Sequence, residues 1–336
     1  MPVSGAERFE TFDCLTCAGA GHRVDSATRT KRASRAQIMR ILISGGSGLV
    51  GTELAKALRQ QGHTVGKLVR PGGKAGAVDI PWDPMSASVD IAPMEGTDAL
   101  VHLSGASIGE GRWTAARKAV LRSSRVDSTR VLVDAIARLR QKPSVFACAS
   151  AIGFYGDRGD EILTESSECG TDFLSLVARD WEAEAMRAEH SGIRTVRLRY
   201  GVILSDAGGA LPRMVTPFRL GIGGRFGSGR QWMSWITLDD AIEITRLAIE
   251  NDTLAGAVNV VGPNPVRNAE FTRILASALH RPAIFPAPAF VLRLALGEMA
   301  DPLLLLSQRV RPEKLLAMNY AFRFSDLAAT FGVLLR

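Results

Sequence analysis

Cysteine is scarce in this chain. Among 336 residues there are four, Cys14, Cys17, Cys148 and Cys169. So few thiols argue against a disulfide-stabilised scaffold and favour a reducing compartment, so we expect a cytoplasmic location. Cys14 and Cys17 form a C-x-x-C pair, but no second pair of ligands follows at the spacing of a structural zinc site. We therefore expect no metal.

Long apolar runs and blocks of like charge are also missing. The most apolar stretch, residues 290–307, is interrupted by charged residues and a proline, so we expect no membrane span. The first residues lack the apolar core of a secretory signal. The net charge is +7, of which residues 1–38 contribute +2 and the rest is spread over the body. This pattern does not favour a nucleic-acid partner, whereas attraction of an anionic cofactor or substrate is a simpler interpretation.

What is present from Met39 onward is a regular alternation of strand and helix patterns. Apolar strands are predicted at residues 40–44, 63–69, 98–104, 144–150 and 193–199, and helices at 49–61, 114–140 and 173–190. Short apolar strands separated by amphipathic helices are typical of an α/β fold with a doubly wound parallel sheet. The last third is less regular and predicts a small, mostly helical C-terminal lobe. Residues 1–38 have no period and predict a disordered extension.

A glycine cluster follows the first predicted strand in "SGGSGLVG". Gly45 suits the tight turn off the strand, Gly48 allows close backbone approach to a pyrophosphate, and Gly51 lets the helix lie near the strand. The helix N-terminus would then offer free N–H groups to phosphate. The cluster therefore predicts a dinucleotide site. The alternative is an ordinary glycine-rich turn between a strand and a helix.

The next two strand ends refine this hypothesis. Arg70 ends the second strand, where a site for a cofactor without a 2′-phosphate usually has an acid, so a guanidinium there favours NADP over NAD. The alternative is a solvated surface arginine. Small residues, Ser104 and Gly105, end the strand at 98–104 and would leave room for adenosine and diphosphate. His102 on that strand is interpreted as a packed histidine.

With these features in place, the chain resembles the extended short-chain dehydrogenases/reductases, and within them the atypical epimerase-like subfamily with its own small C-terminal domain. The motifs that carry the resemblance are "RILISGGSGLVG", "VHLSGA", "SSRVDSTR", "SAIGFYG", "RYGVIL" and "RVRPEKLLAMNYAFRFSDLAATF", and they cover about residues 39–336. The resemblance implies that the protein binds NADP(H). The expected cofactor-binding residues, including those named above, are Gly45, Ser47, Gly48, Leu49, Val50, Gly51, Arg70, Leu103, Ser104, Gly105, Arg125 and Ile203. For Arg125 the alternative is a charge on a helix face.

The resemblance also implies a division into domains. Residues 1–38 would be the extension and 39–260 the NADP-binding Rossmann domain, with lobe insertions from about 205. Residues 261–336 would form the substrate-side lobe, including the family-specific terminal domain at about 281–336.

The catalytic residues of the wider superfamily are only partly matched. That machinery is a Ser or Thr that holds the substrate oxygen and a Y-x-x-x-K helix whose tyrosine exchanges a proton with it. Ser150 and Tyr155 are the candidates here, although Tyr155 has a structural alternative beside the nicotinamide end of the pocket. The expected helix contains neither tyrosine nor lysine, because Leu174 and Ala178 occupy the two positions.

Three functions therefore compete. The first is an NADP-dependent oxidoreductase or epimerase with altered machinery, acting on an unidentified small polar substrate. The second is a non-catalytic NADP(H)-binding sensor or regulator, and the third is a structural or partner-binding protein. The glycine cluster and Arg70 disfavour the third. We expect a monomer or a homodimer.

Overall fold

The structure, a computed structural model, describes Met1 and residues 38–73, 76–84 and 89–335. The N-terminal extension lies almost entirely outside the described residues, as do Cys14 and Cys17. No helix in the described part of the chain is long and apolar enough to cross a membrane.

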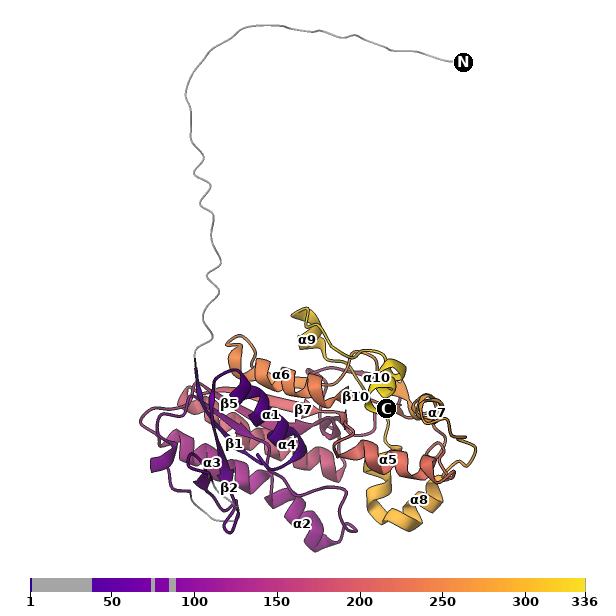
Figure 1. The fold of residues 1–336 in the computed structure, drawn as a ribbon, viewed down its shortest axis with the longest axis horizontal. Helices are drawn as coiled ribbons and strands as arrows, with labels where there is room; N and C mark the ends of the chain where they lie inside the picture. Colours follow the sequence, from indigo (N-terminus) through magenta and orange to yellow (C-terminus); the bar gives the residue numbers. More distant parts are fainter. Residues whose placement is uncertain (2–37, 74–75, 85–88, 336) are drawn as a thin grey trace. The chain divides into compact units, whose positions relative to one another are not determined.

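A seven-stranded parallel sheet forms the centre of residues 38–335 (Figure 1). Its spatial order is β11 (Gly256–Val260), β7 (Arg194–Tyr200), β5 (Val145–Ala151), β4 (Ala99–His102), β1 (Arg40–Ser44), β2 (Thr64–Val69) and β3 (Ile80–Pro81). The chain builds outward from β1 in one direction through β2 and β3 and then in the other from β4. The predicted doubly wound sheet is thus confirmed, and its switch point lies between β1 and β4, where open α/β sheets bind ligands.

Helices cover both faces of the sheet because its central strands are apolar on both sides. On one face Ile41 and Ile43 pack with Leu54 of α1 (Leu49–Gln60) and with α6 (Leu238–Glu250). On the other, Leu42 packs with Leu132 of α3 (Val126–Ala137) and with α4 (Phe173–Met186). Burial of every residue from Ile41 to Ser44 explains why this strand has no polar alternation.

The long helix predicted at 114–140 is two helices, α2 (Ala115–Ser123) and α3. Ser124 and Arg125 interrupt it because both side chains bind the segment that follows β4. The hydroxyl of Ser124 accepts a hydrogen bond from the N–H of Ala106 at 3.1 Å. The guanidinium of Arg125 donates to the carbonyls of Leu121 and Ala106, each at 3.0 Å. The break therefore fixes the end of β4, the strand beside the switch point.

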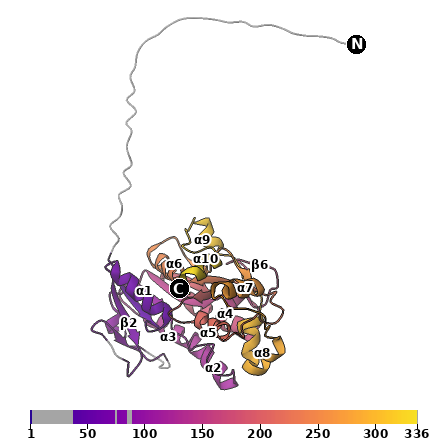
Figure 2. The same ribbon diagram turned by 45° about the vertical axis from the view of Figure 1, so that its right-hand side comes forward.

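The later part of the chain adds a smaller lobe. Helices α5 (Ala210–Arg219), α7 (Asn268–Ala278) and α10 (Leu327–Leu334) share a core in which the rings of Phe271 and Phe331 lie 5.3 Å apart. Figures 1 and 2 show α5, α7 and α8 (Ala289–Leu296) grouped together. The predicted domain boundaries stay a prediction.

Short two-stranded pairings tie this lobe to the body. They are β8 (Val202–Leu204) with β10 (Trp235–Thr237), β9 (Trp232–Met233) with β12 (Val266–Arg267), and β6 (Ile162–Leu163) with β13 (Arg309–Val310). The short helix α9 (Glu313–Ala317) follows β13 and packs on β11.

Candidate functional site

The glycine cluster forms the turn between β1 and α1, and two of its glycines are required by packing. Gly45 has φ +72°, and a Cβ on it would lie 2.7 Å from the carbonyl carbon of Leu103. A Cβ on Gly51 would lie 2.3 Å from the oxygen of Gly45. Strand, turn and helix can therefore approach each other this closely only without side chains at these positions.

Gly48, in contrast, faces open space. It is the N-cap of α1, and a Cβ there would meet only the oxygen of Gly45, at 3.4 Å, among the described atoms. Ser47 and Gly48 are exposed, and no side chain caps the helix or places an acid in its first turn. The N–H groups of Leu49 and Val50 thus head a helix with an open, electropositive end. This arrangement fits a phosphate group of a dinucleotide.

Two cations lie on β2 or at its end. Arg70 is exposed, directly follows β2, and its carbonyl accepts a hydrogen bond from Gly73 at 3.0 Å. The stem of Lys67 runs along the glycine turn, because a Cβ on Gly46 would lie 2.9 Å from its Cγ. Sequence reasoning missed Lys67, although a lysine in the otherwise uncharged strand "TVGKLV" is a visible signal.

The segment after β4 forms the wall opposite β2. The N–H of Leu103 donates to the carbonyl of Ser44 at 3.1 Å, and Ser104 and Gly105 follow without bulk. A Cβ on Gly105 would lie 3.2 Å from the guanidinium carbon of Arg125. This guanidinium also lies 5.5 Å from the ring centre of Trp181. Burial, and secondarily the charge of Arg117, lowers the pKa of Arg125 to about 10.

Ile203, on β8, lies near the start of α1 and the glycine turn. A Cβ on Gly209 would lie 3.1 Å from the side chain of Leu49 and 3.9 Å from the carbonyl of Ile203. The loop after β8 therefore lies against the start of α1. The structure brings the predicted residues of the turn, of the β4 end and of β8 to the switch point of the sheet. Their role in cofactor binding stays a prediction.

His102 is the packed histidine that the sequence suggested. It is fully buried, its Nδ1 lies 2.5 Å from the hydroxyl of Ser44, and its Nε2 lies 3.2 Å from that of Ser128. Burial, with a smaller effect of Arg125, lowers the pKa of His102 to about 3. The imidazole is therefore neutral and joins β1 to α3.

Ser150, the first catalytic candidate, is engaged in a buried ion-pair network. Its hydroxyl donates to the carboxylate of Glu182 on α4 at 2.7 Å. Arg199 on β7 donates to both oxygens of the same carboxylate, at 2.7 and 2.9 Å. All three residues are only 3% exposed. Burial opposes the charge on Arg199, but the bonds to Glu182 raise its pKa above the ordinary value.

Tyr155, the second candidate, belongs to this network. Its hydroxyl donates to Asn259 at 2.6 Å and accepts from Arg199 at 2.9 Å, and its side chain is completely buried. Burial raises the pKa of Tyr155 to about 12. Sequence reasoning did not identify Glu182, Arg199 and Asn259 as partners of Ser150 and Tyr155. The three residues lie on separate elements, and no local sequence pattern indicates that they meet. The catalytic assignment of Ser150 and Tyr155 stays a prediction.

The two positions of the superfamily tyrosine and lysine lie on α4, as expected. A Cβ on Gly153, just after β5, would lie 3.7 Å from the Cβ of Leu174. Leu174 packs in an apolar cluster with Trp113 and Met299, and Ala178 is buried. The two positions of α4 that would carry a proton relay are therefore apolar.

This combination of features defines the class. An open glycine turn at a helix N-terminus, placed at the switch point of a parallel sheet, is that of a dinucleotide-binding Rossmann protein. The comparison with known families then makes the assignment narrower. Residues 41–262 match the NAD dependent epimerase/dehydratase family, and residues 287–332 match DUF1731, a domain of unknown function. The chain belongs to this epimerase family and to the extended short-chain dehydrogenases/reductases, which confirms the resemblance predicted from the sequence.

Similar proteins come from bacteria and mammals. Epimerase family protein Mb2239 of Mycobacterium bovis is 40% identical over 292 residues, which are 87% of this chain and 96% of the relative. Epimerase family protein YfhF of Bacillus subtilis is 38% identical over 293 residues, 86% and 95% of the two chains. The crystal structure of human epimerase family protein SDR39U1 with NADPH superposes with a TM-score of 0.80 at 33% identity, covering 88% of this chain and 99% of the human one.

Proposed function

We propose that this protein binds NADP(H) across the glycine turn and acts as an oxidoreductase that does not use the superfamily's tyrosine–lysine relay. The observation that carries the binding is the open helix end at Gly48, with no acid in its first turn. Arg70 and Lys67, on the β2 side of the turn, would supply positive charge for a 2′-phosphate. The NADPH in the structure of the human relative supports the same cofactor.

The proposal on chemistry follows from the apolar residues at the two relay positions of α4. When bound, NADPH supplies a hydride. Leu174 and Ala178 can neither donate nor remove a proton, and the hydroxyls of Ser150 and Tyr155 are already donating to Glu182 and Asn259. The site is therefore better suited to reducing an electron-poor carbonyl or quinone, whose reduced anion takes a proton from water. Epimerisation through alcohol oxidation would require a base.

The buried network favours a second candidate. A non-catalytic NADP(H) sensor needs the open glycine turn but no proton relay, and the pairing of Ser150, Glu182 and Arg199 is compatible with that function. The two candidates differ in a single measurable property, which is turnover.

Cofactor binding is tested by titrating protein fluorescence with NADPH and NADH. We expect NADPH to bind more tightly, and Arg70→Gln or Lys67→Gln to weaken NADPH by about 1.5–3 kcal/mol without changing NADH, because each removes a charged hydrogen-bond donor. Lys56→Gln is the matched control, since its ammonium lies on α1 and pairs with Glu53 at 3.4 Å. Equal wild-type affinity for the two cofactors would remove the proposal.

Turnover is tested by following NADPH absorbance with a panel of quinones and electron-poor carbonyls. Steady oxidation that persists in folded Ser150→Ala and Tyr155→Phe supports the oxidoreductase without a relay. Oxidation abolished in both variants restores the catalytic assignment of these residues. A flat signal across the panel, with NADPH binding intact, favours the sensor.

A further inference from the structure

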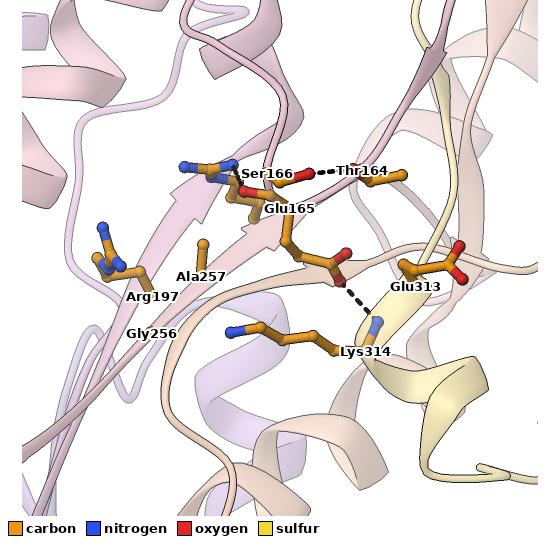
Figure 3. Close-up of a pocket in the computed structure, with 9 residues that line it drawn as sticks. Thr164, Glu165, Ser166, Arg197, Gly256, Ala257, Glu313 and Lys314 are labelled. Carbon is orange, nitrogen blue, oxygen red and sulfur yellow. Dashed lines mark hydrogen bonds between the residues drawn. The ribbon is translucent and has the colours of Figure 1, made fainter.

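A cavity lies on the α4 side of the β7–β11 edge of the sheet, away from the glycine turn. Its volume is about 420 Å³. The lining comes from the segment after β6, from β7, from β11 and from α9: Thr164, Glu165, Ser166, Arg197, Arg199, Gly256, Ala257, Glu313 and Lys314. Figure 3 shows the carboxylate of Glu165 between the strands and α9, with Lys314 and Arg197 toward Gly256. None of the residues predicted to bind the dinucleotide lines this cavity.

Two cations converge on one point of its wall. Gly256 has φ +73°, and the position of a Cβ on it lies 3.3 Å from Nζ of Lys314 and 3.4 Å from Nη2 of Arg197. Within the described residues, the Lys314 ammonium donates one hydrogen bond, to the carbonyl of Ala255 at 2.6 Å. The absence of a side chain at Gly256 thus leaves room for a ligand atom between an ammonium and a guanidinium.

Polar atoms in the lining also lack partners. Oε2 of Glu165 and Nε of Arg197 are buried, and neither has a hydrogen-bond partner within the described part of the chain. The other oxygen of Glu165 accepts from the N–H of Asn259 at 3.1 Å and from that of Lys314 at 3.4 Å. Buried donors and acceptors without partners are costly, so a ligand that satisfies both would be stabilised here.

The charges of the lining select the kind of ligand. Glu182 pairs with Arg199 at 2.7 Å and with Arg197 at 3.3 Å, and Glu313 pairs with Arg311 at 3.2 Å. The three cations Arg197, Arg199 and Lys314 are therefore matched by the two carboxylates of Glu182 and Glu165, which leaves an excess of one positive charge. Burial lowers the pKa of Lys314, the charge of Glu165 opposes this effect, and the positive charge of Arg197 adds to it. A monoanion would offset both, whereas Glu165 would repel the second charge of a phosphate.

We propose that this cavity is a binding site for a small carboxylate that also carries a hydroxyl or ammonium donor, such as an α-hydroxy or α-amino acid. The carboxylate lies between Arg197 and Lys314 over Gly256. The donor bonds to Oε2 of Glu165. Because Arg199 also lines the cavity, an occupant contacts the network that ends at Ser150 and Tyr155.

The test is calorimetry and thermal unfolding of the full chain with four probes, each up to about 10 mM. Lactate and L-serine carry both groups, acetate carries only the carboxylate, and ethanolamine carries no carboxylate. We expect lactate or L-serine to bind and raise the unfolding temperature, acetate to bind at least about tenfold more weakly, and ethanolamine not to bind.

Variants locate the site. Lys314→Gln should weaken binding of the acid roughly 10- to 100-fold, and Glu165→Gln should reduce the affinity for lactate or L-serine to about that for acetate. Lys56→Gln, which removes an exposed cation on α1 outside the cavity lining, is the control and should leave the affinity unchanged. No binding by either acid, or unchanged affinity in folded Lys314→Gln, would overturn the proposal, as would tighter binding of inorganic phosphate. NADPH titration of Lys314→Gln is predicted to match wild type, so failure of this site and failure of the cofactor site are distinguishable.

Discussion

The two halves of the switch-point edge differ in what their polar groups do. On the β1–β2 half, the first turn of α1 has neither a capping side chain nor an acid, Arg70 is exposed, and Lys67 is half-buried along the glycine turn. On the β5–β7 half, Ser150, Tyr155 and their partners bond to one another out of contact with solvent. The first half is arranged to bind a ligand, and the second is arranged to hold strands together. Substitutions should therefore separate binding from stability.

The largest effect is expected from Glu182→Ala. It leaves Arg199 buried without its carboxylate and should lower the free energy of unfolding by about 3–5 kcal/mol. Urea unfolding measures it. Glu161→Ala, which breaks an exposed pair with Arg158, is the control and should cost no more than about 1 kcal/mol. Equal losses in the two variants would mean that the β5–β7 half does not hold the fold in this way.

His102, on β4 between the halves, should make stability depend on pH. Its pKa is about 3 when folded and ordinarily 6.5, so below pH 6.5 the unfolded chain gains a proton that the folded chain does not. Wild type should lose roughly 3 kcal/mol more than His102→Gln as pH falls from 6.5 to about 4. Urea unfolding at several pH values measures the difference, and parallel curves for the two proteins would contradict it.

Gly48→Ala should act mainly on binding. The new methyl group occupies the space left for a phosphate and should weaken NADPH by about 2 kcal/mol. Stability should fall by no more than about 1 kcal/mol, because Ala is a poorer N-cap than Gly but fits the extended backbone at this position. Gly51→Ala is the contrasting variant, since its Cβ would collide with the Gly45 carbonyl and should destabilise the fold. A loss of stability in Gly48→Ala equal to that in Gly51→Ala would contradict the assignment of Gly48 to ligand binding and of Gly51 to packing.

The smallest effect is expected from Tyr155→Phe. Removing the hydroxyl leaves Asn259 and Arg199 one partner short, which should cost about 1.5 kcal/mol of stability. Thermal unfolding measures this, and NADPH affinity should stay at the wild-type value. A change in affinity without a change in stability would assign Tyr155 to the cofactor site instead.

The sequence predicted what depends on local pattern. Gly45 and Gly51 are identifiable because a strand precedes them and a helix follows, and the predicted helix at 173–190 contains neither tyrosine nor lysine for the relay. The break at Ser124 and Arg125 was not predicted, because it depends on bonds to Ala106, 18 and 19 residues away. The network that joins Ser150 to Tyr155 uses Glu182 of α4 and Arg199 of β7, and Tyr155 also bonds to Asn259 of β11. Only the assembled sheet brings these residues together. Long-range pairing of this kind leaves no period in the sequence.

The pairing of β6 with β13 has a consequence for how the chain folds during synthesis. Ile162 and Leu163 pair with Arg309 and Val310, and Arg158 donates its N–H to the carbonyl of Ser307. At a ribosomal rate of about 5–20 residues per second, β13 is synthesised roughly 7–30 s after β6. Throughout that interval the loop after β5 has an unpaired edge, so a chaperone that shields it would be most useful before β13 emerges.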